Sequence, residues 1–232
     1  LPLAPRERHK NIMDEISQVT LGKVQQNSER FAILELGKYS MNMNSICMGQ
    51  FNSSESGDFC ILGGAIGQNT RLTTLKVALR PIELGTTNQQ FYNGLKRNSS
   101  INELSIYCRN ESIAGGIGQE ILQAYKENKN LRQIAIRGRT NLQNGGEQII
   151  ADTLRSCTNL KRILLIGCDI TDEQLLPMVE AIRGHCVVSY LEFTQNRIGN
   201  AGCEALSSLL IWIILSSSGA PPPPSDIIIS SS

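Results

Sequence analysis

The chain has 232 residues, of which 41% are hydrophobic and 19% charged, and its formal net charge is +1 at pH 7. A chain of this length can bury a core, and its charge gives no overall attraction to nucleic acid or to a membrane surface. Its seven cysteines include no CxxC pair, which indicates neither a zinc site nor a closed disulfide framework and favours a reducing compartment such as the cytoplasm. The longest apolar run, residues 209–215, is shorter than the ~20 residues of a membrane helix.

Residues 1–30 are predicted to form an N-terminal segment outside the repeated part of the chain. The sequence opens at Leu1 without a methionine, which we interpret as a cut end. Within the segment, apolar residues recur at loose helical spacing, namely Ile12, Ile16, Leu21 and Val24. This spacing predicts a helix or an N-terminal cap.

The next part of the chain is predicted to contain a strand at residues 31–36, FAILEL, and a helix at residues 58–66, DFCILGGAI. The polar stretch between them, residues 41–57, is about 12 residues longer than the spacing found further along the chain allows. We interpret this stretch as an inserted loop or mobile lobe.

From Leu72 onward the chain repeats a short pattern of the form apolar-x-x-apolar-x-apolar. The first positions of five such segments are separated by 29, 30, 29 and 28 residues. The segments are Leu72, Leu75 and Val77; Ile101, Leu104 and Ile106; Leu131, Ile134 and Ile136; Leu160, Ile163 and Leu165; and Val188, Leu191 and Phe193. This regular period predicts stacked units rather than the unrelated strands of a sandwich.

A second apolar ladder follows in the same phase. Its members are pairs four residues apart: Leu62 and Ile66, Phe91 and Leu95, Ile121 and Tyr125, Ile150 and Leu154, Met178 and Ile182, and Leu206 and Leu210. Such a pair marks one face of a helix, so each unit is predicted to hold a strand, a turn and an amphipathic helix. The helices are predicted to end near turn residues, namely Asn69, Asn98, Asn128 and Asn159. Stacking would align the strands in a parallel sheet with the helices as an outer layer.

The end of the chain departs from this pattern. Residues 216–232 contain SSSGAPPPPSD, which cannot continue the units and is predicted to be a disordered tail. Just before it lie the apolar residues Ile211, Trp212, Ile213 and Ile214. Three interpretations stay open, because these side chains could cover the open end of the core, mark a truncated array or form a self-association surface.

The best-formed unit, LEFTQNRIGNAGCEALSSLL at residues 191–210, together with Val188 resembles a leucine-rich repeat of the ribonuclease-inhibitor-like (RNI-like) type. Asn196 stands where that family places an asparagine or cysteine, and Cys168 has the same place in the preceding unit. A side chain there satisfies main-chain groups as the chain leaves the strand. Earlier units carry arginine in this column, so we expect irregular turns at Arg80, Arg109 and Arg139.

The resemblance extends over roughly residues 31–210 and implies an α/β fold. It implies a leucine-rich-repeat domain at 31–215, with the insertion at 41–57. The expected architecture is a solenoid of about five to six repeats of 28–30 residues. It would form a short horseshoe arc, with parallel strands on the concave face and helices on the convex face.

In such a solenoid, strand residues between the core positions point to the concave face, which is the family's usual recognition surface. Basic residues gather on the middle strands with a tyrosine on either side, which favours a protein partner with an acidic surface. The predicted partner-binding residues are Lys76, Tyr107, Arg132, Arg137, Lys161, Arg162, Tyr190 and Glu192. Leu164 and Ile166 share this face and are not needed for the predicted core. A solvated surface that is locally basic is the alternative.

These observations favour a non-catalytic protein–protein interaction module, with no cofactor, metal, nucleic acid or membrane. His9 and His185 stand in no triad or metal constellation. GGAIGQ and AGGIGQ recur in phase with the repeat, and neither has the GxxxxGK[ST] pattern of a phosphate loop. Two alternatives stay open. One is a GTPase-activating protein of the Ran type, in which an arginine of the strand-end column would stabilise phosphoryl-transfer charge. The other is the sensor region of a larger receptor.

Overall fold

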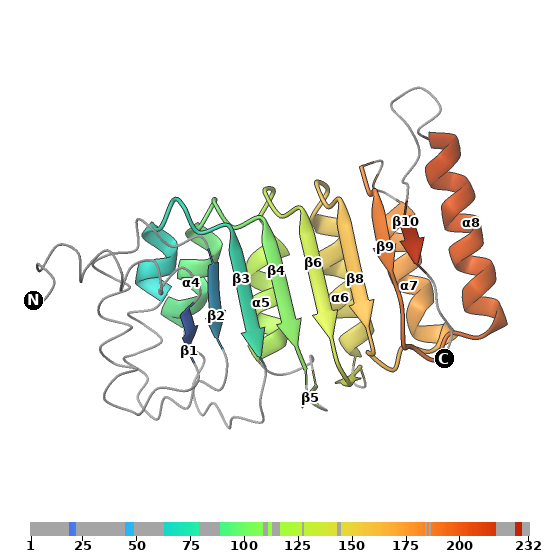
Figure 1. Ribbon diagram of the computed structural model, residues 1–232, viewed down its shortest axis with the longest axis horizontal. Coiled ribbons are helices and arrows are strands. Elements are labelled where there is room, and N and C mark those ends of the chain that lie inside the picture. The colour runs from blue at the N-terminus through green and yellow to red at the C-terminus, as the bar shows by residue number, and fades with distance from the viewer. Residues whose placement is uncertain are drawn as a thin grey trace, which may run out of the picture.

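The computed structural model describes residues 19–21, 45–48, 63–78, 89–108, 111–112, 117–126, 128–142, 145–183, 185, 187–216 and 226–228. Over most of this part, strands and helices alternate along the chain (Figure 1). The predicted α/β class, with parallel strands and accompanying helices, is confirmed.

The larger of two sheets among the described strands is parallel, in the order β1-β2-β3-β4-β6-β8-β9-β10. Its strands are β1 (Val19–Leu21), β2 (Ser45–Met48), β3 (Thr74–Ala78), β4 (Glu103–Tyr107), β6 (Gln133–Arg137), β8 (Arg162–Ile166), β9 (Tyr190–Glu192) and β10 (Asp226–Ile228). From β3 to β9 the register joins equivalent positions of consecutive units, as in Leu75 beside Leu104 and Ile134 beside Ile163. The sheet therefore grows by one strand per unit.

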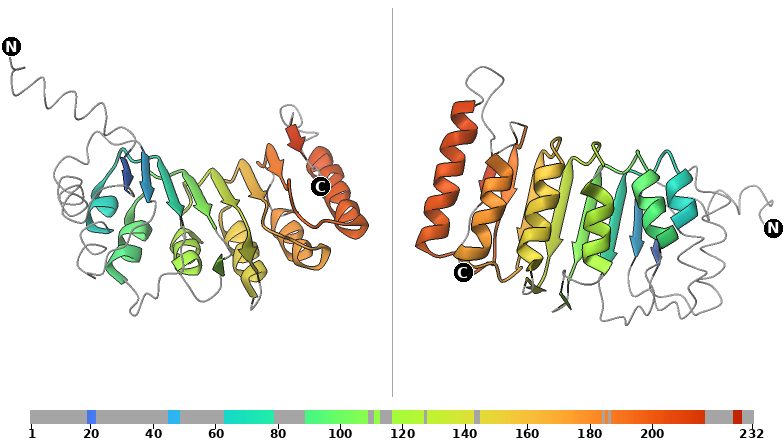
Figure 2. Two further views of the ribbon diagram at one scale, coloured as in Figure 1. Left: turned by 60° about the horizontal axis from the view of Figure 1, so that its bottom comes forward. Right: turned by 180° about the vertical axis from the view of Figure 1, so that it is seen from behind.

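The helices lie along one side of this sheet and leave its other side uncovered (Figure 2). They are a segment at residues 63–68, α4 (Gln89–Arg97), α5 (Ile117–Lys126), α6 (Gly146–Ser156), α7 (Asp172–Arg183) and α8 (Asn200–Ser216). A second, two-stranded sheet joins β5 (Glu111–Ser112) to β7 (Thr140–Asn141) where the chain turns from strand to helix. We call the helix-free side of the larger sheet the open face.

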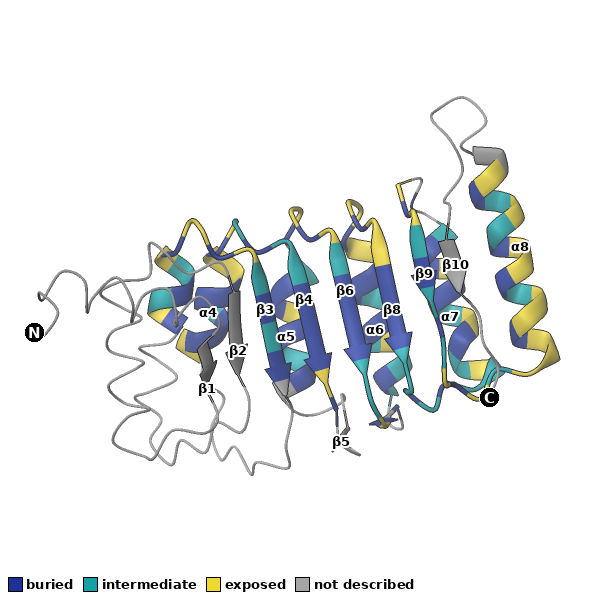
Figure 3. Ribbon diagram, viewed as in Figure 1, coloured by how far each residue is buried: buried dark blue, intermediate teal, exposed yellow. Residues whose placement is uncertain are grey.

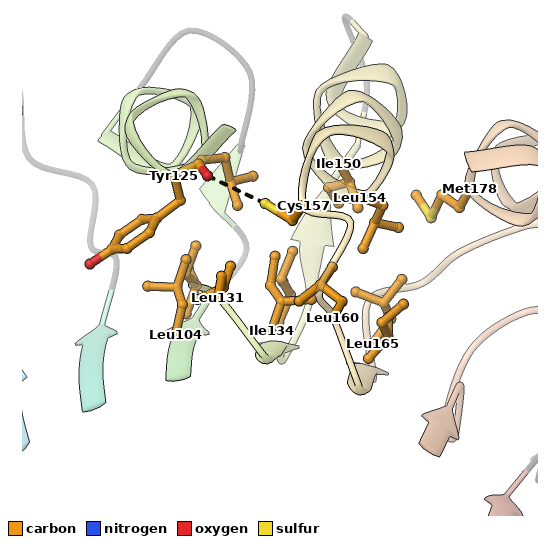
Figure 4. Close-up of a cluster of buried hydrophobic side chains, with 14 of the residues drawn as sticks. Leu104, Tyr125, Leu131, Ile134, Ile150, Leu154, Cys157, Leu160, Leu165 and Met178 are labelled. Atoms are coloured by element: carbon orange, nitrogen blue, oxygen red, sulfur yellow. Dashed lines mark hydrogen bonds between the residues drawn. The ribbon is translucent and has the colours of Figure 1, made fainter. Parts of the chain in front are cut away.

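The core lies between the sheet and the helices. Strand residues at the predicted apolar positions, such as Leu104 and Leu165, face the inner sides of the helices, where Ile150 and Leu154 meet them (Figure 4). The central residues of β4, β6 and β8 are buried on both sides of the sheet, and the helices are buried along their inner stripe (Figure 3). One unit alone could not bury both surfaces, so each unit depends on its neighbours for its core.

A column of asparagines organises the passage from each helix to the next strand. Asn69, Asn98 and Asn128 are buried, and each Oδ1 accepts a hydrogen bond from a main-chain amide two residues later. Asn98 also donates through Nδ2 to the carbonyl oxygens of Ile66 and Asn69, at 2.7 Å each. Buried main-chain groups that lie outside the helices and strands are satisfied in this way.

Cys157 continues the asparagine column in the next unit, where the sequence analysis placed Asn159. Its thiol donates to the carbonyl oxygen of Tyr125 at 3.3 Å (Figure 4). Asn159 is exposed two residues further along. At this position a thiol can replace the asparagine carboxamide, because the side chain donates one hydrogen bond to the preceding unit, to the carbonyl oxygen of Tyr125.

The strand-end column has the predicted role at Asn196 and Cys168. Asn196 accepts hydrogen bonds from the amides of Cys168 and Ile170, at 3.0 and 3.2 Å. Its Nδ2 donates to the carbonyl oxygens of Leu165 and Phe193, at 2.6 and 2.9 Å. The Cys168 thiol donates to Ile136 O at 3.3 Å. Each side chain therefore ties its strand end to the preceding unit.

The N-terminal part of the sheet differs from the sequence-based expectation. Strand β2 lies inside residues 41–57, which were predicted to be an inserted loop, and pairs with β3 with Ile46 beside Leu75. Strand β1 lies inside the predicted helix or cap and pairs with β2. Residues 31–36, the predicted strand, lie outside the described residues. The physical reason is pairing: the edge of β3 offers unpaired main-chain groups to the extended segment at 45–48.

The C-terminal part also differs from the prediction of a disordered tail at 216–232. Helix α8 continues through Ser216, and β10 pairs in parallel with β9. Isoleucines in the short segment after the prolines have high β-propensity, and the β9 edge offers unpaired main-chain groups to it. The rest of the predicted tail lies outside the described residues.

Candidate functional site

The open face is built from the strand residues that alternate with the core residues. The register aligns them in three rows that cross the strands. The first row holds Thr74, Glu103, Gln133, Arg162 and Tyr190; the middle row Lys76, Ser105, Ala135, Leu164 and Glu192; and the last row Tyr107, Arg137 and Ile166. Neighbouring positions in a row are about 4.8 Å apart.

The centre of the middle row is small and closely covered. Ser105, Ala135 and Leu164 are only 6%, 1% and 4% exposed, although they point away from the core cluster. The longer side chains of the first and last rows stand around them. Leu164 was expected to be free for a partner, and the structure corrects this, because the side chain is buried. Ile166, at the end of β8, keeps partial exposure.

Three of the predicted binding residues form a connected cluster at the C-terminal side of the open face. The Arg162 guanidinium lies over the Tyr190 ring, 4.7 Å from its centroid. The Tyr190 hydroxyl donates to Glu192 Oε2 at 3.0 Å, and the Thr194 hydroxyl donates to Glu192 Oε1 at 3.3 Å. The stacking and the hydrogen bonds hold the tyrosine ring, and the ring holds the guanidinium in turn. Sequence analysis missed the role of Thr194, although its position two residues after Glu192 on the same strand side was a signal for it.

Tyr107 and Arg137 make a second pair at the other ends of the strands. They are register partners on β4 and β6, and Ile166 follows them in the same row on β8. Tyr107 is 40% exposed and Arg137 is half-buried. The row thus offers a ring, a guanidinium and an aliphatic side chain side by side.

Arg132 and Lys161 lie on the loops just before β6 and β8, at the rim of the face. Both side chains are exposed. Their carbonyl groups support the sheet: Arg132 O accepts from the amides of Lys161 and Arg162, at 2.8 and 3.0 Å. Lys161 O accepts from the amides of Ser189 and Tyr190, at 2.8 and 3.0 Å. The main chain is thus fixed while the charged side chains stay in solvent.

The eight predicted binding residues therefore do not form a single patch. Lys76 stands on β3, with β4 and β6 between it and Arg162. Arg132, Lys161 and Arg162 gather where the strands begin, while Arg137 and Tyr107 stand where the strands end. Strands of this length separate their two ends by about 13 Å, so the face has two basic contact points rather than one.

The ion pairs of the described residues lie away from the open face, on the helices and between Arg197 and Asp169 in the loops after β9 and β8. On the helices, Lys126 and Arg155 both pair with Asp152, and Arg183 pairs with Glu180. The pKa of the Asp152 carboxyl is lowered by a hydrogen bond from Gln148 and by its two cations. No carboxylate of the described residues pairs with the five basic side chains of the predicted site, which are Lys76, Arg132, Arg137, Lys161 and Arg162.

The residues considered for catalysis show no catalytic arrangement within the described part of the chain. His185 is buried, and its pKa is lowered from the ordinary value by that burial. Arg139 is exposed after β6, whereas Arg80, Arg109 and His9 lie outside the described residues. No group of three or more His, Cys, Asp and Glu residues in the described chain could hold a metal ion.

The apolar residues of α8 divide between the core and the surface. Ile213 is buried at 3% exposure and belongs to the core, so the structure corrects its assignment to a self-association surface. Trp212 is half-buried and packs against the core. Ile211 and Ile214 are 59% and 51% exposed. The helix therefore covers the last unit and leaves two isoleucines in solvent.

Comparison with known proteins gives limited results. No family model matches the chain, and no curated protein matches it significantly. A solved structure described as Leiomodin-1 Actin-Binding Site 2 (ABS2) aligns with 81% of this chain and 90% of its own, at 12% identity and a TM-score of 0.39. A likeness this weak carries no functional argument. None of the helices in the described residues is long and apolar enough to cross a membrane.

Proposed function

We propose that this chain is a non-catalytic protein-interaction module built from leucine-rich repeats of the RNI-like type. The regular 29, 30, 29 and 28 residue spacing and the alternation of strand and helix support about five to six repeats of 28–30 residues in a short horseshoe arc. The Asn196 and Cys168 hydrogen bonds are the contacts that the repeat type requires at the end of its strands. The buried thiols of Cys157 and Cys168, which form no disulfide, support a reducing compartment, the cytoplasm.

The partner is a protein with an acidic surface, bound through the open face. The contrast in ion pairing carries this proposal: the paired helix cations lie on the opposite side of the sheet, and the cations of the predicted site have no carboxylate within the described chain. Unpaired cations gathered on one face produce a positive potential that accelerates association with an acidic partner and excludes basic ones. Tyr107 and Tyr190 add amphipathic ring surface of the kind that anchors interfaces.

Arg162 is the strongest single anchor on this face. Its stacking on Tyr190 restricts the guanidinium before a partner arrives, which lowers the entropy lost when a carboxylate binds. Arginine presents its donors in a planar fork that matches a carboxylate in two places. Glu192 accepts hydrogen bonds from the Tyr190 and Thr194 hydroxyls, and no ion pair joins it to Arg162 in the described chain.

The test compares capture of partners from a native lysate by three proteins. The first is the original chain, and the second carries Arg137→Glu and Arg162→Glu on the open face. The third carries Lys126→Glu and Arg155→Glu on helices α5 and α6, with the same change in net charge. We expect a partner that binds the first and third proteins and is lost from the second, with equal circular dichroism for all three. A partner that binds all three equally would exclude the open face as the recognition surface.

A further inference from the structure

The main chain of the open face leaves a partner no edge to join in the middle of the sheet. Strands β4, β6 and β8 each pair with a described strand on both sides. Their inter-strand amide and carbonyl groups are therefore used, and a partner segment cannot extend the sheet by strand addition there. A partner that covers this face contacts side chains only. An α-helix can lie on such a face as a single segment, because its main-chain groups are already paired within the segment.

The two basic contact points have a spacing that a helix can match. Ile166 is the register partner of Arg137, and Arg162 lies four residues before Ile166 on the adjacent strand. The Cα atoms of the two arginines are therefore about 14 Å apart, on a diagonal across β6 and β8. Residues seven or eight apart on one helix face are separated by about 10.5 to 12 Å. The acidic side chains of the helix and the two arginine side chains can bend toward each other, which makes up the difference between the two spacings.

The surface between the two arginines is apolar and low. Ala135 and Leu164 lie on the diagonal in the middle row, and Ile166 stands beside it. The small Ala135 side chain lets a neighbouring helix approach closely, and Tyr107 and Tyr190 stand at opposite ends of the strands. Ala135 and Leu164 are already buried, so an aliphatic residue placed between the two acidic residues of a helix would add burial of apolar surface at Ile166, which is partly exposed.

From these relationships we propose that the open face binds an amphipathic α-helix of its protein partner. The helix carries two carboxylates seven or eight residues apart, which meet Arg137 and Arg162, and an aliphatic residue between them that contacts the partly exposed Ile166. This inference rests on the proposed function and adds the secondary structure and charge spacing of the partner segment. The charges are complementary, because the two arginines lack a carboxylate partner among the described residues.

The experiment selects binders from two displayed peptide libraries with the same randomised positions. One library has an alanine-rich helical scaffold, and the other has Pro-Gly at its centre, which prevents a continuous helix. Selected peptides are then tested by fluorescence anisotropy against three proteins. They are the original chain, the Arg137→Gln, Arg162→Gln variant, and a Lys126→Gln, Arg155→Gln control with the same loss of charge on the helices.

We expect enrichment from the helical library, with acidic pairs seven or eight positions apart. Their affinity should fall about 10-fold or more for the open-face variant and stay within about 2-fold for the control. Acidic peptides could also be enriched equally from both libraries and lose the same affinity for the open-face variant. That outcome would refute the helical conformation of the bound segment and would still support an acidic partner. Three other outcomes would overturn the inference. The selected peptides could carry acidic pairs without a preferred spacing, or neither library could be enriched. The selected peptides could also bind both variants as tightly as they bind the original chain. The lysate capture decides the proposed function independently.

Discussion

The carboxamide of Asn98 joins two consecutive units of the chain. Its Nδ2 donates to the carbonyl oxygen of Asn69 at 2.7 Å, while its Oδ1 accepts from the amide of Ile101 at 2.8 Å. Asn69 holds the same position 29 residues earlier and accepts from the amide of Leu72 at 2.8 Å. One buried side chain therefore ends a helix, begins a strand and binds the preceding unit.

Replacing this side chain by a smaller apolar one should destabilise the whole chain. We expect Asn98→Ala to lower the free energy of unfolding by about 2 to 4 kcal/mol, because it leaves buried main-chain donors and acceptors unsatisfied. Asn159→Ala is the matched control, since Asn159 is exposed and water can replace its hydrogen bond to the carbonyl oxygen of Lys129, so stability should change by less than about 1 kcal/mol. Urea unfolding followed by circular dichroism measures both. Similar midpoints for the two variants would mean that the asparagine column is not a main stabilising contact.

Gly94 and Gly64 provide a contrast between two helical glycines. A Cβ on Gly94 would collide with the main chain of Gly63, so the helical segment at 63–68 and α4 can approach only through glycine. We expect Gly94→Ala to destabilise the chain by about 1 to 3 kcal/mol through this overlap. At Gly64 nothing lies within 4 Å of an added Cβ, and alanine there should be neutral or stabilise by up to about 1 kcal/mol. Thermal unfolding of the two variants distinguishes steric exclusion from simple helix propensity, which predicts stabilisation in both.

Stability should fall in mild acid because of His185. Burial lowers the pKa of its imidazole below the ordinary value of 6.5, against the opposing effect of the Thr158 and Leu154 carbonyls. In the buried ring, Nδ1 has no hydrogen-bond partner among the described residues. The unfolded chain binds a proton more readily than the folded one, so the contribution is fully present above about pH 6.5 and is lost as pH falls through the folded pKa. Denaturant unfolding across this range should show a smaller pH dependence for His185→Gln. An unchanged slope in the variant would assign the acid sensitivity to other groups.

Thiol reactivity should divide the described cysteines into two groups. Burial raises the pKa of the Cys157 thiol to about 11 and that of Cys168 to about 12, whereas Cys203 is exposed on α8. The thiolate is the reactive form, so alkylation by iodoacetamide near neutral pH should modify Cys203 first and the buried pair only after unfolding. Peptide mapping by mass spectrometry identifies the modified sites. Rapid native labelling at Cys157 or Cys168 would show that the units open locally on the labelling timescale.

The Arg162 and Tyr190 contact should affect binding more than folding. Tyr190→Phe keeps the ring under the guanidinium and removes the hydroxyl bond to Glu192, so we expect partner affinity within about 3-fold of the original. Tyr190→Leu removes the ring and should weaken binding by about 5-fold or more, since a cation–π contact contributes roughly 0.5 to 1 kcal/mol at an exposed site and also orients the arginine. Affinity for a selected acidic peptide measures both variants. Equal loss in Phe and Leu variants would assign the effect to the hydroxyl.

The middle of the fold could be predicted well from the sequence, because the apolar residues that define the repeat period are also the residues of the core. The apolar triads from Leu72 to Phe193 became the inner sides of β3, β4, β6, β8 and β9. The same triad continues upstream at Met43, Ile46 and Met48, 29 residues before Leu72, Leu75 and Val77. It was overlooked because its residues alternate with asparagine, serine and cysteine, while FAILEL offered a more hydrophobic run. Residues 45–48 form a strand because they pair with β3, and the composition of the segment does not reveal this pairing.

The open face was predicted in its residues but not in its internal contacts. Strand alternation places Arg162, Tyr190 and Glu192 on one side of the sheet, and the structure agrees. Alternation alone cannot tell that a ring lies under a guanidinium or that Leu164 is covered, because both depend on the rotamers of neighbouring side chains. The register also divides the basic residues between the two ends of the strands, which a one-dimensional pattern treats as one cluster.

The carbonyl groups that precede the strands have a consequence for how such a chain changes over evolutionary time. Thr73 O, Asn102 O, Arg132 O and Lys161 O each accept two amides from the following unit. Every donor and acceptor in this series comes from the same place in its own unit. Duplication or loss of a whole unit therefore rejoins equivalent groups and leaves none of them unpaired, whereas the insertion of one residue within a strand disturbs the pairing of that strand with both of its neighbours. Recombination in steps of one repeat is the kind of length change that this architecture tolerates.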